Sequence, residues 1–194
     1  MPVTSHEVFL EASQVLAQFA ALGDQIARID EATRRMAAGF RIGGKVLACG
    51  NGGSACEAMH LCEELTGRFR HDRPALPAIA CVDSGHLTCV GNDYGYERVF
   101  ARWVEALGVK GDTLVVFSTS GNSKNVIEAV GAAKQRGLYT LALLGGSGGQ
   151  LAGRCDVEWI VPSKKAERVQ EVHQVIMHAL IAGIERELFP EQAG

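Results

Sequence analysis

Two side chains that suit proton transfer or metal binding, His60 and Glu64, follow a glycine-rich turn. The apolar run at residues 45–49 predicts a buried strand, and the turn at residues 50–54 reads Gly-Asn-Gly-Gly-Ser. The next residues lack proline or glycine until Gly67 and predict a helix, on which residues four apart share one face. Glycines let backbone N–H groups approach a ligand, and a helix N-terminus favours anions. The pattern indicates a catalytic cleft.

A second turn, residues 118–123, carries four hydroxyls in the sequence Ser-Thr-Ser-Gly-Asn-Ser. Hydroxyls and backbone amides at a helix N-terminus suit a phosphate dianion. The plain alternative is a polar turn with Ser123 as a helix cap, but four hydroxyls with a glycine favour phosphate. Because the motifs G-x-x-x-x-G-K-[ST] and G-x-G-x-x-G are absent from the sequence, a nucleoside triphosphate or a dinucleotide is disfavoured.

Between these turns, residues 91–96 read Gly-Asn-Asp-Tyr-Gly-Tyr. Asn92 and Asp93 could hydrogen-bond the hydroxyls of a sugar. The same residue types also make a good turn, so the chemistry of this stretch leaves both interpretations open.

The predicted last helix, residues 165–189, adds four polar side chains: Gln170, His173, Gln174 and His178. A lone histidine among apolar neighbours, as His178 is, is more often a core residue than a ligand. With His60 and Glu64, however, two imidazoles, a carboxylate and an amide oxygen form a plausible zinc set. Gln170 and His178 lie about 12 Å apart along an ideal helix. Both side chains can reach one ion only when fully extended, unless Gln170 precedes the regular helix. The sequence therefore leaves open whether these residues bind a metal.

From residue 45 onward, apolar runs of strand length alternate with helical patterns. The predicted strands are residues 45–49, 78–82, 113–118, 139–143 and 158–161. The predicted helices are residues 54–66, 96–107, 123–136 and 165–189. Short apolar strands separated by helices predict an α/β fold with a doubly wound, five-stranded parallel sheet covered on both faces. Such sheets bind ligands beyond the carboxyl ends of their strands, where both turns fall.

Residues 5–41 predict two helices, divided at Gly23-Asp24, that share a long apolar seam. The seam residues are Val8, Ala12, Val15, Phe19, Leu22, Ile26, Ile29, Met36 and Phe40. A seam of this kind requires a partner helix. A hairpin that packs on its own domain is one interpretation. We favour a hairpin that joins a helical bundle between subunits, because the seam is long for a small domain.

Size and composition predict a single globular domain over residues 1–194, with 47% hydrophobic and 21% charged residues. The net charge of −3 does not indicate the positively charged surface that binds nucleic acid, so we expect no nucleic-acid partner. No apolar run approaches the roughly 20 residues that cross a bilayer. No signal peptide is visible at the N-terminus, so we expect a cytoplasmic protein that binds no membrane.

The six cysteines form no C-x-x-C pair, which disfavours a zinc knuckle or a thioredoxin-like motif. Most lie in apolar surroundings, which predicts small buried hydrophobic residues. A catalytic thiol at Cys56 or Cys62 is the alternative.

Five motifs occur together along the chain. They are C-G-N-G-G-S from Cys49, A-M-H-x-x-E-E-L-T-G-R from Ala58, V-G-N-D-Y-G-Y from Val90, S-T-S-G-N-S from Ser118 and R-V-Q-E-V-H-x-x-x-x-H from Arg168. In this order and spacing the chain resembles the phosphoheptose isomerases, a family of sugar isomerase (SIS) domain proteins, over nearly its whole length. The serine motif alone indicates only an SIS domain, whereas the histidines and glutamate with Gln170 are more selective.

This resemblance implies a flavodoxin-like SIS fold and conversion of D-sedoheptulose 7-phosphate to D-glycero-D-manno-heptose 7-phosphate, the first step toward nucleotide-activated heptose. It also implies a homotetramer with active sites between subunits, and one zinc ion per subunit. The implied substrate contacts are Asn51, Gly52, Gly53, Glu64, Asn92, Asp93, Ser118, Thr119, Ser120, Ser123 and Gln170. The implied zinc ligands are His60, Glu64, Gln170 and His178, and Glu64 and His178 carry over as the acid/base pair.

Isomerisation moves one proton between adjacent carbons and another between their oxygens. In our hypothesis, Glu64 takes the C1 proton of the ketose and returns it at C2 of an enediol, while His178 serves the oxygens. Zinc ligation by Glu64 would make it a poorer base. Two positions depart from the family pattern and bear on substrate fit: Ala55 stands where many relatives have histidine, and Glu167 where many have aspartate.

Two functions without catalysis remain as alternatives. Some SIS proteins similar to these isomerases bind the replication initiator DnaA, but such a protein could lose His60, Glu64 or His178, and all three are present. A sugar-phosphate sensor would use the serine turn without chemistry. A fused DNA-binding domain would support a sensor, and no segment has room for one.

Overall fold

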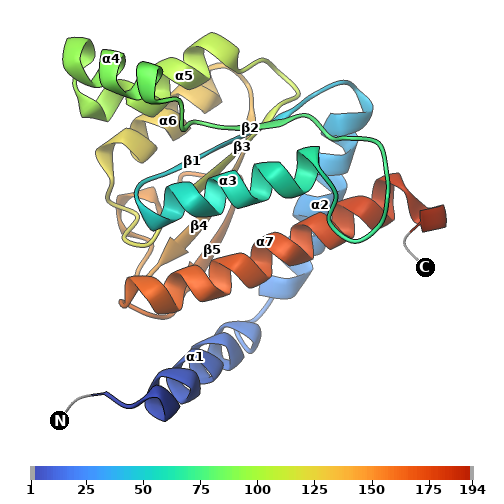
Figure 1. Cartoon of the computed structure of the whole chain (residues 1–194), viewed down its shortest axis with the longest axis vertical. Coiled ribbons are helices and arrows are strands. Elements are labelled where there is room, and N and C mark those ends of the chain that lie inside the picture. Colours follow the sequence, from blue (N-terminus) through green and yellow to red (C-terminus); the bar gives the residue numbers. More distant parts are fainter. Residues whose placement is uncertain (1–2, 193–194) are drawn as a thin grey trace.

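The computed structural model describes residues 3–192, and its centre is a parallel sheet with strand order β2-β1-β3-β4-β5 (Figure 1). The strands are β1 (Val46–Gly50), β2 (Ala78–Ala80), β3 (Thr113–Ser118), β4 (Tyr139–Gly145) and β5 (Val157–Val161). The predicted doubly wound, five-stranded sheet is thereby confirmed. The limits of β3 match the prediction, whereas β2 is shorter than predicted and β4 is longer.

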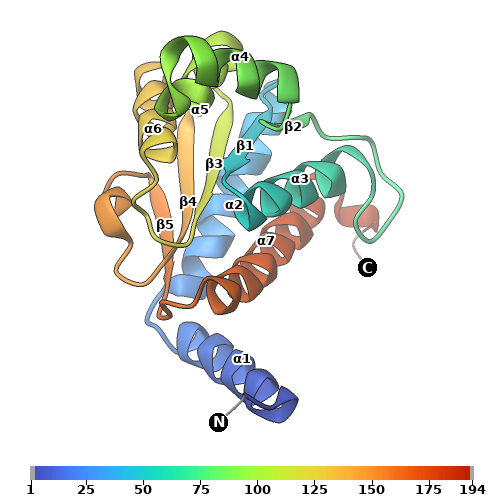
Figure 2. The same cartoon turned by 60° about the vertical axis from the view of Figure 1, so that its left-hand side comes forward.

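Helices cover both faces of this sheet (Figures 1 and 2). They are α1 (Ser5–Ala20), α2 (Gln25–Arg41), α3 (Gly53–Thr66), α4 (Ser84–Tyr94), α5 (Val99–Leu107), α6 (Lys124–Gln135) and α7 (Ala166–Leu188). Side chains alternate along a strand. Val46 and Ala48 of β1 therefore join the core beneath α2, α3 and α7, whereas Leu47 and Cys49 join the core beneath α4, α5 and α6.

Helix α4 was not predicted. Its sequence, Ser-Gly-His-Leu-Thr-Cys-Val-Gly-Asn-Asp-Tyr, contains two glycines and buries only Val90 strongly, so it shows no amphipathic period. Asp83 supplies the N-cap, since its side chain accepts a hydrogen bond from the His86 amide. The stretch that could have been a turn, residues 91–96, is the last turn of α4 followed by Gly95 with φ +89°.

The two predicted N-terminal helices are present, but they do not lie against each other along their length. Both use α7 as a neighbour: α2 packs along it, and α1 packs near its first turns and projects beyond the sheet (Figure 2). Arg168 of α7 fixes α1 in place by donating a hydrogen bond of 2.7 Å to the Val8 carbonyl. None of the helices among residues 3–192 is long and apolar enough to cross a membrane.

Candidate active site

The glycine and serine turns of the site lie at the carboxyl edge of the sheet, where β1 and β3 are neighbours. Gly50 at the end of β1 pairs with Phe117 of β3, so the turns that follow these strands lie side by side. The strand order changes direction between β1 and β3, because the chain goes from β1 out to β2 before it returns to β3. Parallel sheets bind ligands at such switch points.

Three sequence-predicted site residues converge between α3 and α7, away from this edge, because His60 and Glu64 lie in the later part of α3 and His178 lies in the middle of α7. His60, Glu64 and His178 each offer a ligand atom, and these atoms all lie within 4.8 Å of one another. All three side chains are partly buried. We call these residues the His–Glu–His cluster. We expected Gln170 and His178 to complete the His60 and Glu64 pair across a subunit boundary, but the structure brings His178 to the pair within one chain.

One polar contact and two ring contacts hold the side chains of the cluster. Within α3, His60 Nε2 lies 3.3 Å from Glu64 Oε1. The His178 ring meets the His60 ring edge-on at 5.2 Å between centroids and stacks on Phe69 at 5.5 Å. Burial lowers the pKa of His178 below the ordinary 6.5, and His60 and Arg70 lower it further, while Glu64 opposes them. At neutral pH, His178 is therefore an uncharged imidazole that can accept a proton or ligate a metal.

The donor atoms of the cluster fit a metal ion. Two imidazole nitrogens and one carboxylate are the protein ligands of many catalytic zinc sites, which leave a fourth position open. The lowered pKa of His178 also suits this role, because only the neutral imidazole ligates. The cluster is therefore a group that could hold a metal.

Gln170 lies nearer the start of α7 and inside the regular helix, so the alternative in which it precedes the helix is wrong. Its amide rests on the glycine turn, because a Cβ added to Gly53 would come within 2.4 Å of Gln170 Nε2. Gln170 and His60 both line a cavity of about 480 Å³, together with Glu57 and Glu167. The structure thus connects Gln170 with the cluster through His60.

A buried polar pair lies between Gln170 and the cluster. His173 of α7 is fully buried, and its Nδ1 lies 3.4 Å from Glu57 Oε1 of α3. Its Nε2 lies 3.1 Å from the Leu144 carbonyl of β4, which fixes the ring against the sheet. Of the two histidines in the C-terminal motif, His173 is thus the core residue and His178 faces the site.

The serine turn is shaped by its own backbone. Ser118 is buried, and its Oγ accepts a hydrogen bond of 3.1 Å from the Gly121 amide. Gly121 has φ +64°, and a Cβ there would lie 1.8 Å from the Gly148 carbonyl oxygen, so this position requires glycine. Ser120 is exposed, and Ser123 occupies the N-cap position of α6 without a side-chain capping bond. Both hydroxyls therefore stand near a helix N-terminus.

Hydrogen bonds to two other side chains fix the orientation of the Asn51 side chain. Its amide exchanges two hydrogen bonds with the buried Asn125 amide, at 2.9 and 2.8 Å, and Tyr96 donates its hydroxyl to Asn51 Oδ1 at 3.1 Å. This amide pair ties the glycine turn to the first turn of α6. Sequence reasoning missed Asn125, Tyr96 and Phe69, because each reaches the site through contacts with residues distant in sequence.

Asn92 and Asp93 lie on the exposed end of α4, where Asn92 Nδ2 donates a hydrogen bond of 2.7 Å to Asp93 Oδ1. They are oriented by the helix and not by a turn.

The cysteines are only partly the buried residues that were expected. Cys49, Cys62 and Cys81 are buried, whereas Cys56 and Cys89 are exposed. Burial raises the pKa of the Cys62 thiol to about 12, which argues against a catalytic thiolate there. Cys56 lines the cavity beside Gln170.

The profile of the SIS domain family matches residues 9–145 of the chain. The phosphoheptose isomerase of Haemophilus ducreyi is 54% identical over 179 residues, which cover 92% of this chain and 92% of that protein. That of Vibrio cholerae is 53% identical over 179 residues, which cover 92% and 94%. The solved phosphoheptose isomerase from Francisella tularensis superposes with a TM-score of 0.88 at 38% identity, covering 95% of this chain and 100% of that one. The Neisseria gonorrhoeae structure gives a TM-score of 0.85 at 40% identity, covering 93% and 96%.

Proposed function

The chain belongs to the SIS domain family and, within it, to the phosphoheptose isomerases, and we propose that it converts D-sedoheptulose 7-phosphate to D-glycero-D-manno-heptose 7-phosphate. It is a sugar-phosphate isomerase. The observation that carries the proposed reaction is the His–Glu–His cluster, assembled within one chain between α3 and α7. The chain therefore carries both a candidate acid/base pair for proton transfer and a turn suited to phosphate.

In the proposed mechanism, the serine turn binds the phosphate through backbone amides and the hydroxyls of Ser118, Thr119, Ser120 and Ser123. The sugar lies toward the cluster, with contacts at Asn51, Gly52, Gly53, Asn92, Asp93 and Gln170. The Asn51–Asn125 pair fixes the spacing between the two turns, since it joins the start of α3 to the start of α6.

Glu64 is the base in this mechanism. Its carboxylate removes the C1 proton of the open-chain ketose and returns it at C2, so an enediol forms and collapses to the aldose. His178 exchanges the second proton between the C1 and C2 oxygens. Its lowered pKa leaves the ring neutral at the start of the cycle, so that it can accept a hydroxyl proton before it donates one.

We propose zinc as the metal, held by His60, Glu64 and His178, with Gln170 as a further ligand. When bound, zinc supplies Lewis acidity to the carbonyl oxygen and to the enediolate. A Glu64 that ligates zinc is a weaker base. Besides the zinc, the Glu64 carboxylate has a partner on its own helix, since its Oε1 lies 3.3 Å from His60 Nε2.

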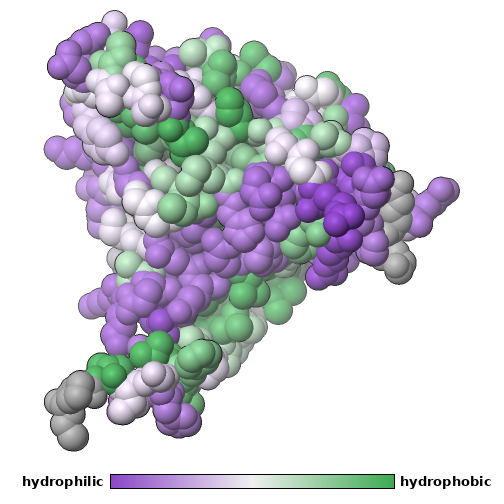
Figure 3. All heavy atoms as spheres, viewed as in Figure 1, coloured by the Kyte–Doolittle hydropathy of each residue, from purple (hydrophilic) through white to green (hydrophobic). Residues whose placement is uncertain are grey.

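We propose a homotetramer in which residues 5–41 form part of the interface and active sites lie between subunits. The support is apolar surface on α1, on α2 and on the segment between them that this chain leaves exposed: Val8, Phe9, Leu10, Leu22 and Ile26. Figure 3 shows hydrophobic residues on the surface at the α1 end of the molecule. Phe9 is 78% exposed, which is an unfavourable position for phenylalanine unless a partner covers it.

The test is to incubate the purified protein with sedoheptulose 7-phosphate, with and without added zinc, and to follow the aldose product by NMR. We expect the aldose to form until the two sugars reach equilibrium. If neither condition gives turnover, the isomerase proposal is wrong, and a protein that only binds a sugar phosphate or DnaA becomes the better account.

A further inference from the structure

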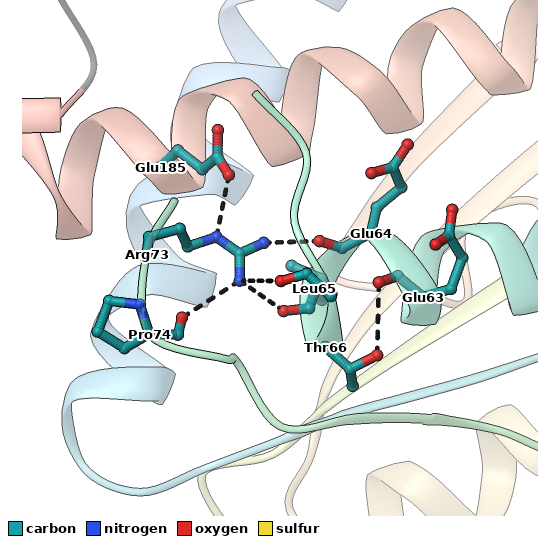
Figure 4. A network of polar contacts seen from close by, with 8 residues as sticks. Glu63, Glu64, Leu65, Thr66, Arg73, Pro74 and Glu185 are labelled. Carbon is teal, nitrogen blue, oxygen red and sulfur yellow. Dashed lines mark hydrogen bonds and ion pairs between the residues drawn. The ribbon is translucent and has the colours of Figure 1, made fainter. Parts of the chain in front are cut away.

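A buried arginine outside the motifs of the site, Arg73, connects the two helices that carry the His–Glu–His cluster. It lies in the irregular segment between α3 and β2, and its side chain is 1% exposed. Its Nε donates a hydrogen bond of 2.9 Å to Glu185 Oε1 of α7. Its two Nη atoms donate to backbone carbonyls at the end of α3: Glu64 at 2.6 Å and Leu65 at 2.7 Å (Figure 4).

These contacts give the Glu64 carbonyl and the Glu185 carboxylate a partner, and they add to the bond of 3.0 Å that the Leu76 amide donates to the Leu65 carbonyl. The last carbonyls of a helix have no partner within the helix, and a cation there also complements the helix dipole. The Glu185 carboxylate is 6% exposed, so it requires the opposite charge of Arg73. Further Arg73 contacts, to the carbonyls of Gly67 at 3.4 Å and Pro74 at 3.2 Å, tie the guanidinium to its own segment.

The two ends of this connection lie on the helices that carry the proposed catalytic groups. On α3, one acceptor is the carbonyl of Glu64 itself, the proposed base. On α7, Glu185 follows His178 by seven residues, which is about two helical turns and therefore the same face. A shift of Arg73 relative to either helix would change how the Glu64 and His178 side chains meet.

We propose that Arg73 and Glu185 are positioning residues for the isomerase reaction. They hold the end of α3 in register with α7, so that Glu64 and His178 face one substrate carbon and its oxygen. This inference rests on the proposed function. Its measurable consequence is a loss of turnover with substrate binding retained, because the serine turn on β3 and α6 makes no contact with Arg73 or Glu185 among those described above.

The planar guanidinium is essential to this role. It directs donors to Glu185 and to two successive carbonyls at once, which the single ammonium of lysine cannot do. Arg73→Lys therefore keeps the charge but loses the fixed geometry. Glu185→Gln keeps an oxygen acceptor for Nε but removes the charge. Arg73→Gln removes both the charge and the planar set of guanidinium donors.

A matched control lies just before β1 and β3, in segments outside α3 and α7. Lys45 Nζ bonds Asp112 Oδ2 at 2.6 Å, and the Asp112 side chain is 1% exposed. Lys45→Gln breaks an ion pair that has one buried partner, and this pair joins neither α3 nor α7. The activity of Lys45→Gln shows how far the loss of a buried ion pair lowers turnover through reduced stability alone.

The experiment measures kcat and KM for the wild-type protein, Arg73→Lys, Glu185→Gln, Arg73→Gln and Lys45→Gln, at a temperature at which circular dichroism shows each to be folded. We expect kcat to fall about 10-fold to 100-fold in Arg73→Lys, as is common for groups that orient catalytic residues. KM should stay within about threefold, and Lys45→Gln should keep the wild-type kcat.

A second readout is independent of both turnover and metal. Side-chain NMR of ¹⁵N-labelled histidines in the metal-free protein should show shifted His60 and His178 resonances in Arg73→Lys and unchanged ones in Lys45→Gln. If Arg73→Gln does not fold, the two milder variants decide the question.

The inference is overturned if Arg73→Lys and Glu185→Gln keep the wild-type kcat and the wild-type histidine resonances while only their melting temperatures fall. If the wild-type protein shows no turnover, the proposed function fails instead. The histidine resonances then still decide whether Arg73 positions the cluster.

Discussion

The seam between α3 and α7 and the serine turn between β3 and α6 are built differently. In the seam, polar side chains lie against one another: Glu57 lies 3.4 Å from His173, His60 lies 3.3 Å from Glu64, and Arg73 bonds Glu185. In the serine turn, the backbone sets the shape, and exposed Ser120 is presented at its surface.

The difference corresponds to two tasks. Proton transfer requires groups held in a fixed mutual geometry, and neighbouring side chains provide it. Phosphate binding requires donors that face outward, and a backbone constrained by glycine provides those. Changes in the seam should therefore lower turnover, whereas changes in the turn should lower affinity or stability.

The largest expected effect is on turnover in the seam. Glu64→Gln should lower kcat by about 10²-fold to 10⁴-fold, because the amide cannot accept the C1 proton. Its neighbour Glu63, whose side chain is 66% exposed, provides the control, and Glu63→Gln should stay near the wild-type rate. Steady-state kinetics of both variants test this. Near-wild-type turnover in Glu64→Gln would remove Glu64 from the role of base.

The second effect is on the framework of the serine turn. Gly121→Ala should lower the free energy of unfolding by about 3 kcal/mol, because it adds strain at a positive φ and a clash with a backbone oxygen. Gly131 on α6 is the control, since nothing lies within 4 Å of a Cβ added there. Gly131→Ala should stabilise the protein by roughly 0.5–1 kcal/mol, as expected for glycine in a helix. Urea unfolding of the two variants measures both values, and equal stabilities would contradict the role given to Gly121.

A smaller effect is expected for one hydroxyl of the turn. Ser120→Ala should raise KM about 10-fold with kcat within threefold, because one hydrogen bond to a charged group is lost. The control is Ser13→Ala on α1, far from Ser120 along the chain. The Ser13 hydroxyl bonds only the Leu10 carbonyl of its own helix. If Ser120→Ala lowered kcat and left KM unchanged, the division between seam and turn would be incorrect.

The smallest effect concerns the acidity of His178. In the metal-free protein its pKa should lie below 6.5, and Arg70→Gln should raise it, because the Arg70 cation opposes protonation. Since folding disfavours the protonated ring, the stability linked to His178 is fully present above pH 6.5 and declines as the pH falls through the lowered pKa. An NMR titration of the histidine side chains measures this, and a pKa above 6.5 would show that burial does not dominate.

The sequence was informative where local pattern and backbone chemistry decide the structure. The apolar run of β3 and the glycine and serine turns were placed correctly because strand length, glycine and capping residues act over a few positions. Helix α4 was missed because Gly85 and Gly91 interrupt its pattern, and tertiary packing overrides their low helix propensity.

The site was harder to predict because its geometry depends on packing between distant segments. Spacing placed His60 and Glu64 on one face of a helix, but it could not show that His178 would reach them while Gln170 rests on Gly53. The Asn51–Asn125 amide pair and the Arg73–Glu185 ion pair join residues 74 and 112 positions apart. No periodicity reveals such pairs.

The central claim is that the seam performs the proton transfer, and C1–H bond cleavage tests it most directly. Sedoheptulose 7-phosphate carrying deuterium at C1 is incubated with the wild-type protein and with Glu64→Gln, and loss of label from C1 is followed by NMR at saturating substrate. Cleavage should be at least about 100-fold slower in Glu64→Gln, while the substrate still binds. Cleavage in Glu64→Gln within threefold of the wild-type rate would contradict the assignment of the chemistry to the α3–α7 seam.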